Sequence, residues 1–278
     1  MPTTLERLGK PSDSCLVIIV ADGLGSSNAA NLAVYRSLRD GVATSAGLQV
    51  PCPWARGAAA EYKGEDIGVA LTVNAEYETY RWGPITQAPS LLGGNGGFPI
   101  TATDLWEHAD PEEARRECRA QIERAILWGF DVTHLSAHLG AICSRPEFFD
   151  IYLDLAIEFG LPISLPDPSV DLGFEARQLA AEEGILVPDR EVAVPLPRSS
   201  RSAIDETIKA LQPGITELHV RPADDTPELR AITDDWAARV ADAHLVTDDW
   251  DFRSALERSG AELISYRALR DIQRSQSA

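Results

Sequence analysis

Short apolar runs alternate with longer segments of helical periodicity along this chain. The clearest run, residues 16–21, is continuously apolar, which is typical of a parallel strand buried on both faces. The clearest helix, 111–128, begins with Asp110 as N-cap, Pro111 at the first helical position and two glutamates in the first turn. Strands are predicted at 16–21, 43–50, 67–73, 132–136, 161–165, 191–196, 215–220 and 262–265. Helices are predicted at 27–40, 54–61, 111–128, 146–159, 172–183, 201–211, 227–243 and 251–259.

This alternation predicts an α/β fold with a parallel sheet. Seven or eight strand–helix units favour a closed or nearly closed (β/α) barrel, similar to a TIM barrel. An open, doubly wound sheet is the alternative, but no GxGxxG motif follows the first strand to support a dinucleotide site. We find no internal repeat, low-complexity tract or linker, so we expect one domain over residues 1–278.

Charge and composition exclude several classes of function. The 278-residue chain carries a net charge of −18, which argues against binding to nucleic acids and to anionic membranes. No apolar run approaches the ~18 residues of a membrane span, and the first residues lack the pattern of a signal peptide. The four cysteines have no metal-ligand spacing and are predicted to be buried thiols. We therefore expect a cytoplasmic protein.

Segment 74–99 departs from the alternation, because it is long and rich in aromatic residues and glycine. Long insertions of this kind form binding loops or subunit interfaces more often than core. We predict that Glu76, Tyr80 and Trp82 contact a ligand, since acidic and aromatic side chains together suit sugar-like molecules. The alternative is that the segment forms a homodimer interface.

One acidic residue stands at the carboxyl end of the first predicted strand. Asp22 follows residues 16–21 and precedes a glycine turn. The carboxyl ends of strands in parallel α/β barrels form the active-site face, so an acid there is well placed for chemistry. A turn or helix-capping aspartate is the other interpretation of an isolated Asp-Gly pair.

The chain contains the motifs Val-Ala-Asp22-Gly, Thr-His-Leu-Ser136-Ala-His138 and Glu-Leu-His-Val-Arg221-Pro. Together with other segments they resemble the YdjC-like (ChbG/HpnK) carbohydrate deacetylase family along nearly the whole chain. The matching segments are 20–31, 66–73, 79–84, 133–140, 217–222 and 262–267. The resemblance implies a deacetylase-type barrel.

The resemblance also implies a reaction, the removal of N-acetyl groups from amino sugars with a divalent metal. Two histidines and the second acid of an Asp-Asp pair hold that metal in the family, and the first acid is the base. Asp22 matches the first acid and His138 the second histidine. The other site positions are substituted: Gly23 replaces the second acid, Ala70 the first histidine, Ser136 a motif aspartate, Arg221 a late histidine and Ser164 an arginine.

These substitutions remove most of the implied metal site. A catalytic divalent ion generally needs about three protein ligands, and glycine and alanine supply no donor atom. We therefore expect no cofactor and no metal-dependent deacetylation, with Asp22 and His138 as the ligands if a divalent metal does bind. The predicted ligand is a small polar molecule, sugar-like or amino-sugar-like, bound at the barrel mouth.

Asp22, His138 and Arg221 are the candidate catalytic residues, and His219 is predicted to line the barrel lumen and to contact the ligand. Two alternatives remain open: a metal-independent enzyme that uses Asp22, His138 and Arg221, and an active metal-dependent amide hydrolase with unconventional ligands. Arg221 is expected either to bind an anionic group of the ligand or to pair with Asp22.

Overall fold

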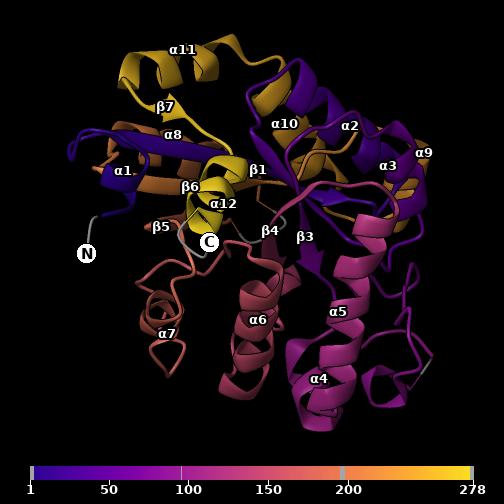
Figure 1. Ribbon diagram of the computed structural model, residues 1–278. Helices are drawn as coiled ribbons and strands as arrows, with labels where there is room; N and C mark the ends of the chain where they lie inside the picture. The colour runs from indigo at the N-terminus through magenta and orange to yellow at the C-terminus, as the bar shows by residue number, and fades with distance from the viewer. Residues whose placement is uncertain (1–2, 95, 195–197, 276–278) are drawn as a thin grey trace.

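The fold is built around a curled sheet of parallel strands, in a computed structural model that describes residues 3–94, 96–194 and 198–275. Within these ranges the sheet has seven strands in the order β4-β3-β2-β1-β6-β5, with β7 also paired to β1 (Figure 1). The strands are β1 (Cys15–Leu24), β2 (Ser45–Leu48), β3 (Ile67–Leu71), β4 (Val132–Ala137), β5 (Arg190–Val192), β6 (Gly214–Val220) and β7 (Glu262–Leu263). Every pairing is parallel, so the predicted α/β barrel class is confirmed.

The gap between the two edges of the sheet is filled by irregular chain. Residues 161–165, predicted to be a strand, make only a bridge between Ile163 and Leu135 of β4. The N–H of Ile163 donates to the carbonyl of Leu186, shortly before β5. The barrel is thus nearly closed, with isolated hydrogen bonds where an eighth strand was expected. The predicted strand at 191–196 is shorter in the structure, and residues 195 and 196 lie outside the described ranges.

Helices surround the sheet, and most lie where the periodicity predicts them (Figure 1). The predicted helix 227–243 is two helices, because the chain is extended at Thr233 between them. Helices α1, α4 and α12 were not predicted. The helices are α1 (Thr4–Arg7), α2 (Asn28–Arg39), α3 (Ala55–Glu61), α4 (Ala102–His108), α5 (Pro111–Leu127), α6 (Pro146–Phe159), α7 (Ala176–Glu182), α8 (Arg201–Lys209), α9 (Pro227–Ile232), α10 (Trp236–Thr247), α11 (Trp250–Ser259) and α12 (Tyr266–Arg274), with 3-10 turns η1 (Pro89–Leu91) and η2 (His138–Gly140).

The two faces of β1 pack into two separate hydrophobic clusters. Val17 and Ile19 pack into the large cluster that joins the sheet to most of the helices. Ile18 and Val20 face a smaller cluster inside the barrel, where they meet Tyr266 at the start of α12. Helix α12 therefore fills one end of the lumen, and the cavity described below lies at the carboxyl ends of the strands.

Helix α5 anchors the long segment 74–99 and the chain just before it. Its buried Glu117 accepts hydrogen bonds from the backbone N–H groups of Ile85 and Thr86, at 3.1 and 2.9 Å. One turn later, Gln121 exchanges two hydrogen bonds with the backbone of Thr72. These hydrogen bonds satisfy backbone groups of a segment with little regular structure, so they fix its position beside the barrel mouth. None of the helices in the described ranges is long and apolar enough to cross a membrane.

Candidate functional site

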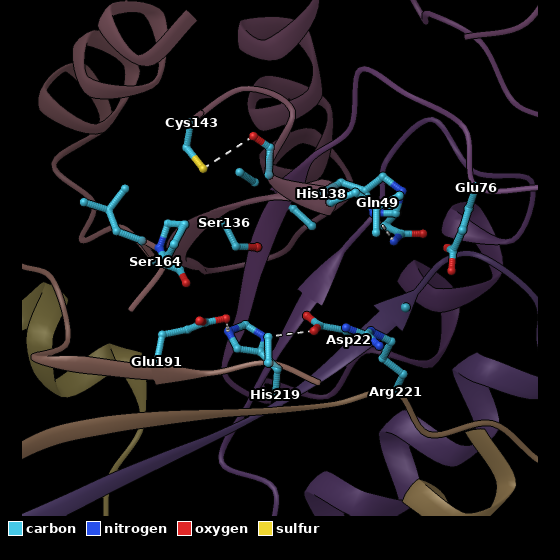
Figure 2. Close-up of a pocket in the computed structure, with 18 of the residues that line it drawn as sticks. Asp22, Gln49, Glu76, Ser136, His138, Cys143, Ser164, Glu191, His219 and Arg221 are labelled. Carbon is cyan, nitrogen blue, oxygen red and sulfur yellow. Dashed lines mark hydrogen bonds and ion pairs between the residues drawn. The ribbon is translucent and has the colours of Figure 1, made fainter. Parts of the chain in front are cut away.

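A cavity of about 270 Å³ opens at the carboxyl ends of the strands (Figure 2). Charged and polar side chains from β1, β5 and β6 and from the chain after β3 and β4 form its wall. The structure brings Asp22, His138, Arg221, His219 and Glu76 to this cavity. The other lining residues are Gly23, Gln49, Ala70, Ser136, Ala137, Leu139, Gly140, Cys143, Ser164, Leu165, Pro166, Glu191, Ala193 and Arg239.

Three positions implied by the family resemblance lie around one glycine, Gly47. Asp22 of β1 is the strand partner of Gly47, and Ala70 of β3 is the strand partner of Ser136 on β4. A Cβ atom on Gly47 would lie 3.3 Å from Ala70 Cβ, 3.4 Å from Ser136 Oγ and 3.6 Å from Asp22 Oδ1. The small side chains of these positions leave an open corner of the cavity next to the carboxylate of Asp22.

His219 lies between two carboxylates at the floor of the cavity. Its Nδ1 is 2.8 Å from Asp22 Oδ2, and its Nε2 is 3.2 Å from Glu217 Oε1. Burial alone would lower the pKa of His219, but the charges of Asp22 and Glu217 raise this pKa well above its usual value. The same imidazolium lowers the pKa of both carboxyl groups, against the effect of their burial. Asp22 is therefore a carboxylate held through Oδ2, with Oδ1 facing the open corner.

Glu217 is fully buried and completes this network from behind. It accepts hydrogen bonds from the Tyr266 hydroxyl at 2.7 Å and from Ser164 Oγ at 2.8 Å. Ser164 stands where the family resemblance implies an arginine, so this position now serves the buried acid. Sequence reasoning missed Glu217, although its place two residues before His219 puts both side chains on one face of β6. It also missed Glu191, whose Oε1 lies 3.9 Å from His219 Nε2.

Of the two contacts expected for Arg221, an ion pair with Asp22 or an anionic group of the ligand, the structure does not show the ion pair. Arg221 Nη1 donates to the carbonyl of Val194 at 2.7 Å, and the backbone N–H of Arg221 donates to Asp242. No carboxylate of the described residues lies within 4.0 Å of the guanidinium. Asp22 is instead hydrogen-bonded to His219, two residues before Arg221.

His138 turns one ring nitrogen to the protein and leaves the other without a partner. The Cys52 thiol donates to Gln49 Oε1, so the Gln49 amide nitrogen faces His138 Nδ1, at 2.8 Å. Nδ1 is then the acceptor, and the proton of the neutral ring lies on Nε2. Burial lowers the pKa of His138 and keeps it neutral. Its Nε2 is buried and has no hydrogen-bond partner among the described residues.

The residue after His138 has an unusual backbone. Leu139 has φ 47°, the only positive φ of a non-glycine residue in the described ranges. This conformation costs an L-residue roughly 1–2 kcal/mol, and such strain concentrates at functional sites. The turn keeps His138 inside the wall of the cavity and exposes the Leu139 side chain at its rim.

The loop residues predicted to contact a ligand divide into two groups. Glu76 lines the cavity, where it forms an ion pair with Arg239 of α10. Tyr80 and Trp82 are not part of the cavity wall: the Tyr80 hydroxyl donates to the carbonyl of Ser26, and buried Trp82 donates from Nε1 to the carbonyl of Asn74. The two rings contact each other, and Trp82 also contacts the ring of His138. They therefore pack behind the cavity wall and do not form its surface.

The residues present do not fit the divalent metal that the family resemblance implies. Gly23 and Ala70 offer no donor atom, and one oxygen of Asp22 is bonded to His219. Within the part of the chain that the structure describes, no group of three or more His, Cys, Asp or Glu side chains is arranged to hold a metal ion. The side chains at the mouth instead provide hydrogen-bond donors and carboxylate oxygens.

Comparison with known proteins gives a consistent family assignment. The sequence model described as YdjC-like protein matches residues 16–258. A carbohydrate deacetylase of Thermus thermophilus is 37% identical over 244 residues, which cover 86% of this chain and 88% of that relative. A carbohydrate deacetylase of Brevibacillus brevis is 34% identical over 154 residues, 54% of this chain and 59% of that relative. A solved structure from Enterococcus faecalis V583, of a protein proposed to cleave cellobiose phosphate, superposes with a TM-score of 0.81 at 22% identity and covers 92% of this chain and 99% of that one.

Proposed function

Because the chain belongs to the YdjC-like family, we propose that it is a carbohydrate deacetylase homologue that binds a small sugar-like ligand without metal-dependent N-deacetylation. One observation carries this proposal: a cavity with the charged side chains of Asp22 and Arg221 in its wall lies at the barrel mouth, while Gly23 and Ala70 leave the metal positions without donor atoms. Under this proposal the chain keeps the ligand-binding cavity of a deacetylase but lacks the metal ion that would act as the Lewis acid.

The volume and the mixed apolar and charged lining of the cavity suit a small ligand. The volume of 270 Å³ is just below the usual range of ~300–1,000 Å³, which favours a ligand about as large as one sugar ring. Asp22 Oδ1 is an acceptor at the open corner, and Arg221 is a donor on the wall. Polyhydroxylated ligands use both kinds of group, so this mixture supports a sugar-like ligand.

A second candidate is a metal-independent enzyme. The observation in its favour is the orientation of Asp22, whose Oδ2 is held at 2.8 Å by the His219 imidazolium. Such a carboxylate is fixed against rotation, and its free oxygen faces the same cavity as Arg221. Arg221 would then stabilise negative charge that develops on the substrate, and the Asp22 carboxylate would accept a proton from it.

Binding and turnover measurements separate these candidates. We expect calorimetry to detect binding of a monosaccharide or amino sugar, with the same affinity in EDTA and in added zinc. We expect no acetate release from N-acetylated sugars under either condition. Acetate release that needs metal and disappears in His138→Ala would contradict the proposal. Turnover that survives EDTA and disappears in Asp22→Asn would favour the second candidate.

A further inference from the structure

We propose that the ligand carries a primary ammonium group, as an amino sugar without an acetyl group does, and that Asp22 and Ser136 bind this group in the open corner of the cavity. The inference rests on the proposed function and narrows its ligand to sugars with a free amine. It follows from two acceptor atoms that the corner leaves unused and from the surplus of carboxylates around the cavity.

Asp22 Oδ1 is the first of these acceptors. The other carboxylate oxygen, Oδ2, is hydrogen-bonded to His219 at 2.8 Å, and no described residue donates to Oδ1. Oδ1 faces the corner, where a Cβ atom on Gly47 would lie 3.6 Å from it. Burial would raise the pKa of Asp22, but the charge of His219 lowers it, so the group is ionised. A ligand donor in the corner therefore meets a full negative charge.

Ser136 Oγ is the second acceptor. Ser136 is only 6% exposed, and its hydroxyl has no hydrogen-bond partner among the described residues. It lines the cavity, and a Cβ atom on Gly47 would lie 3.4 Å from this oxygen. The hydroxyl points toward the side of the cavity where Asp22 lies (Figure 2). A nearly buried hydroxyl without a partner is unfavourable, so a ligand that supplies a donor removes this cost.

An ammonium group fits these two acceptors better than a divalent metal ion does. It has three N–H donors and a compact positive charge. One carboxylate and one hydroxyl satisfy two of these donors, and the third can reach water because the cavity is open. A catalytic metal ion needs about three protein ligands, and Gly47 and Ala70 add no donor atom beside the corner.

The imidazolium of His219 does not balance the acids around it. Asp22 and Glu217 lie 2.8 and 3.2 Å from its two ring nitrogens. A third acid, Glu191, lies 3.9 Å from the same ring. Burial raises the pKa of Glu191, but even with Glu191 protonated one positive charge faces two negative charges here.

The two arginines of the cavity wall have carboxylates of their own. Arg239 forms ion pairs with Glu76 and, at 2.7 Å, with Asp235. Asp242 accepts a hydrogen bond from the backbone N–H of Arg221. Burial raises the pKa of Asp242, and the charge of Arg221 acts in the opposite direction. Among the described residues the carboxylates around the cavity thus outnumber the cations, even if the acids with a raised pKa are neutral, so the cavity favours a cationic ligand.

Titration calorimetry with matched sugars tests this inference at about pH 6.5, where an amine is protonated. Glucosamine carries the ammonium group, N-acetylglucosamine a neutral amide and glucose a hydroxyl at the same position. We expect glucosamine to bind about tenfold or more tighter than either neutral sugar, because charge-assisted hydrogen bonds are the strong ones. Ethanolamine carries the ammonium group without a sugar ring, so it should bind more weakly than glucosamine.

Two variants assign the effect to the corner. In Asp22→Asn the affinity for glucosamine should fall about tenfold or more, while binding of glucose changes little. In Ser136→Ala it should fall about two- to tenfold, because one neutral hydrogen bond is lost and no described partner of Ser136 is disturbed. Asp150→Asn removes one negative charge from the exposed surface of α6 and should bind like the wild type. Circular dichroism of each variant checks that the fold is kept.

The outcomes separate this inference from the proposed function. Equal binding of glucosamine and the neutral sugars, or a preference for glucosamine that Asp22→Asn leaves unchanged, would overturn the ammonium site and leave the sugar-binding function in place. Absence of binding by every sugar, in a protein that is folded, would contradict the proposed function itself. Ethanolamine that binds as tightly as glucosamine, and loses affinity in Asp22→Asn, would support the ammonium site and contradict the sugar of the proposed function. A preference for glucosamine that Asp150→Asn removes as well would show general charge attraction and would also overturn the inference.

Discussion

Replacing His219 with glutamine should destabilise the protein strongly, because this histidine compensates two carboxylates at the cavity floor. Its ring lies 2.8 Å from Asp22 and 3.2 Å from Glu217, and Glu217 is fully buried. Glutamine can donate a hydrogen bond to one of the acids but carries no charge. Breaking a buried ion pair costs about 3–5 kcal/mol, a large part of a typical stability of about 5–15 kcal/mol.

The pH dependence of unfolding gives this prediction a second, independent signature. The pKa of His219 is raised in the folded state, so its stabilisation is complete below about pH 6.5 and is lost as the pH rises through the raised value. The pKa values of Asp22 and Glu217 are lowered, so their stabilisation is present above about pH 4 and is lost as the pH falls through the lowered values. The wild type should therefore exceed His219→Gln most clearly between about pH 4 and 6.5.

Urea unfolding, followed by circular dichroism at several pH values, measures both signatures. His108→Gln is the matched control, since His108 is exposed and the same replacement there should change the free energy of unfolding by less than about 0.5 kcal/mol. A loss below about 1 kcal/mol for His219→Gln at pH 6, or a difference from the wild type that does not depend on pH, would refute the charge compensation argued above.

Three other positions also give measurable outcomes. Glu117→Ala should lower the free energy of unfolding by at least about 2 kcal/mol, because it leaves the partly buried backbone N–H groups of Ile85 and Thr86 without their acceptors; a smaller loss in urea unfolding would count against the anchoring of segment 74–99. Burial raises the pKa of Cys143 to about 11, so iodoacetamide should label it slowly at pH 8 in the folded protein, and rapid labelling would contradict this. Ala70→His alone should not create tight zinc binding, and a stoichiometric ion found by elemental analysis would disprove this.

Periodicity was sufficient to predict most of the fold, because buried parallel strands and amphipathic helices each leave a clear pattern. The run at 16–21 became the centre of β1, and the helix predicted at 146–159 has the bounds of α6. Residues 161–165 are as buried and as apolar as a strand, yet they make only one bridge. Hydrophobicity reports burial, and it does not report whether neighbouring backbone is aligned to pair.

The sequence was sufficient to predict where the site lies in the fold, but it was not sufficient to predict which side chains in the site contact each other. Strand ends of a parallel barrel meet at one mouth, so Asp22, His138 and Arg221 could be placed together from their positions alone. The pairing of Asp22 with His219 rather than with Arg221 depends on side-chain directions across two adjacent strands. Tyr80 and Trp82 have the composition of a sugar-binding loop, but their hydrogen bonds to backbone carbonyls use the polar atoms that a ligand would need.

The backbone conformation at Gly23 limits which side chains can stand at this position. Gly23 has φ +94°, a conformation that strongly favours glycine, and the pairing of β1 with β2 shifts register between Asp22 and Leu24. A Cβ atom on Gly23 would face Ser26 Oγ at 3.6 Å and Ala30 Cβ at 4.0 Å, at the start of helix α2. An aspartate at this position would therefore be strained, and its side chain would start toward α2. Placing an aspartate at position 23 would therefore require this turn to change its conformation.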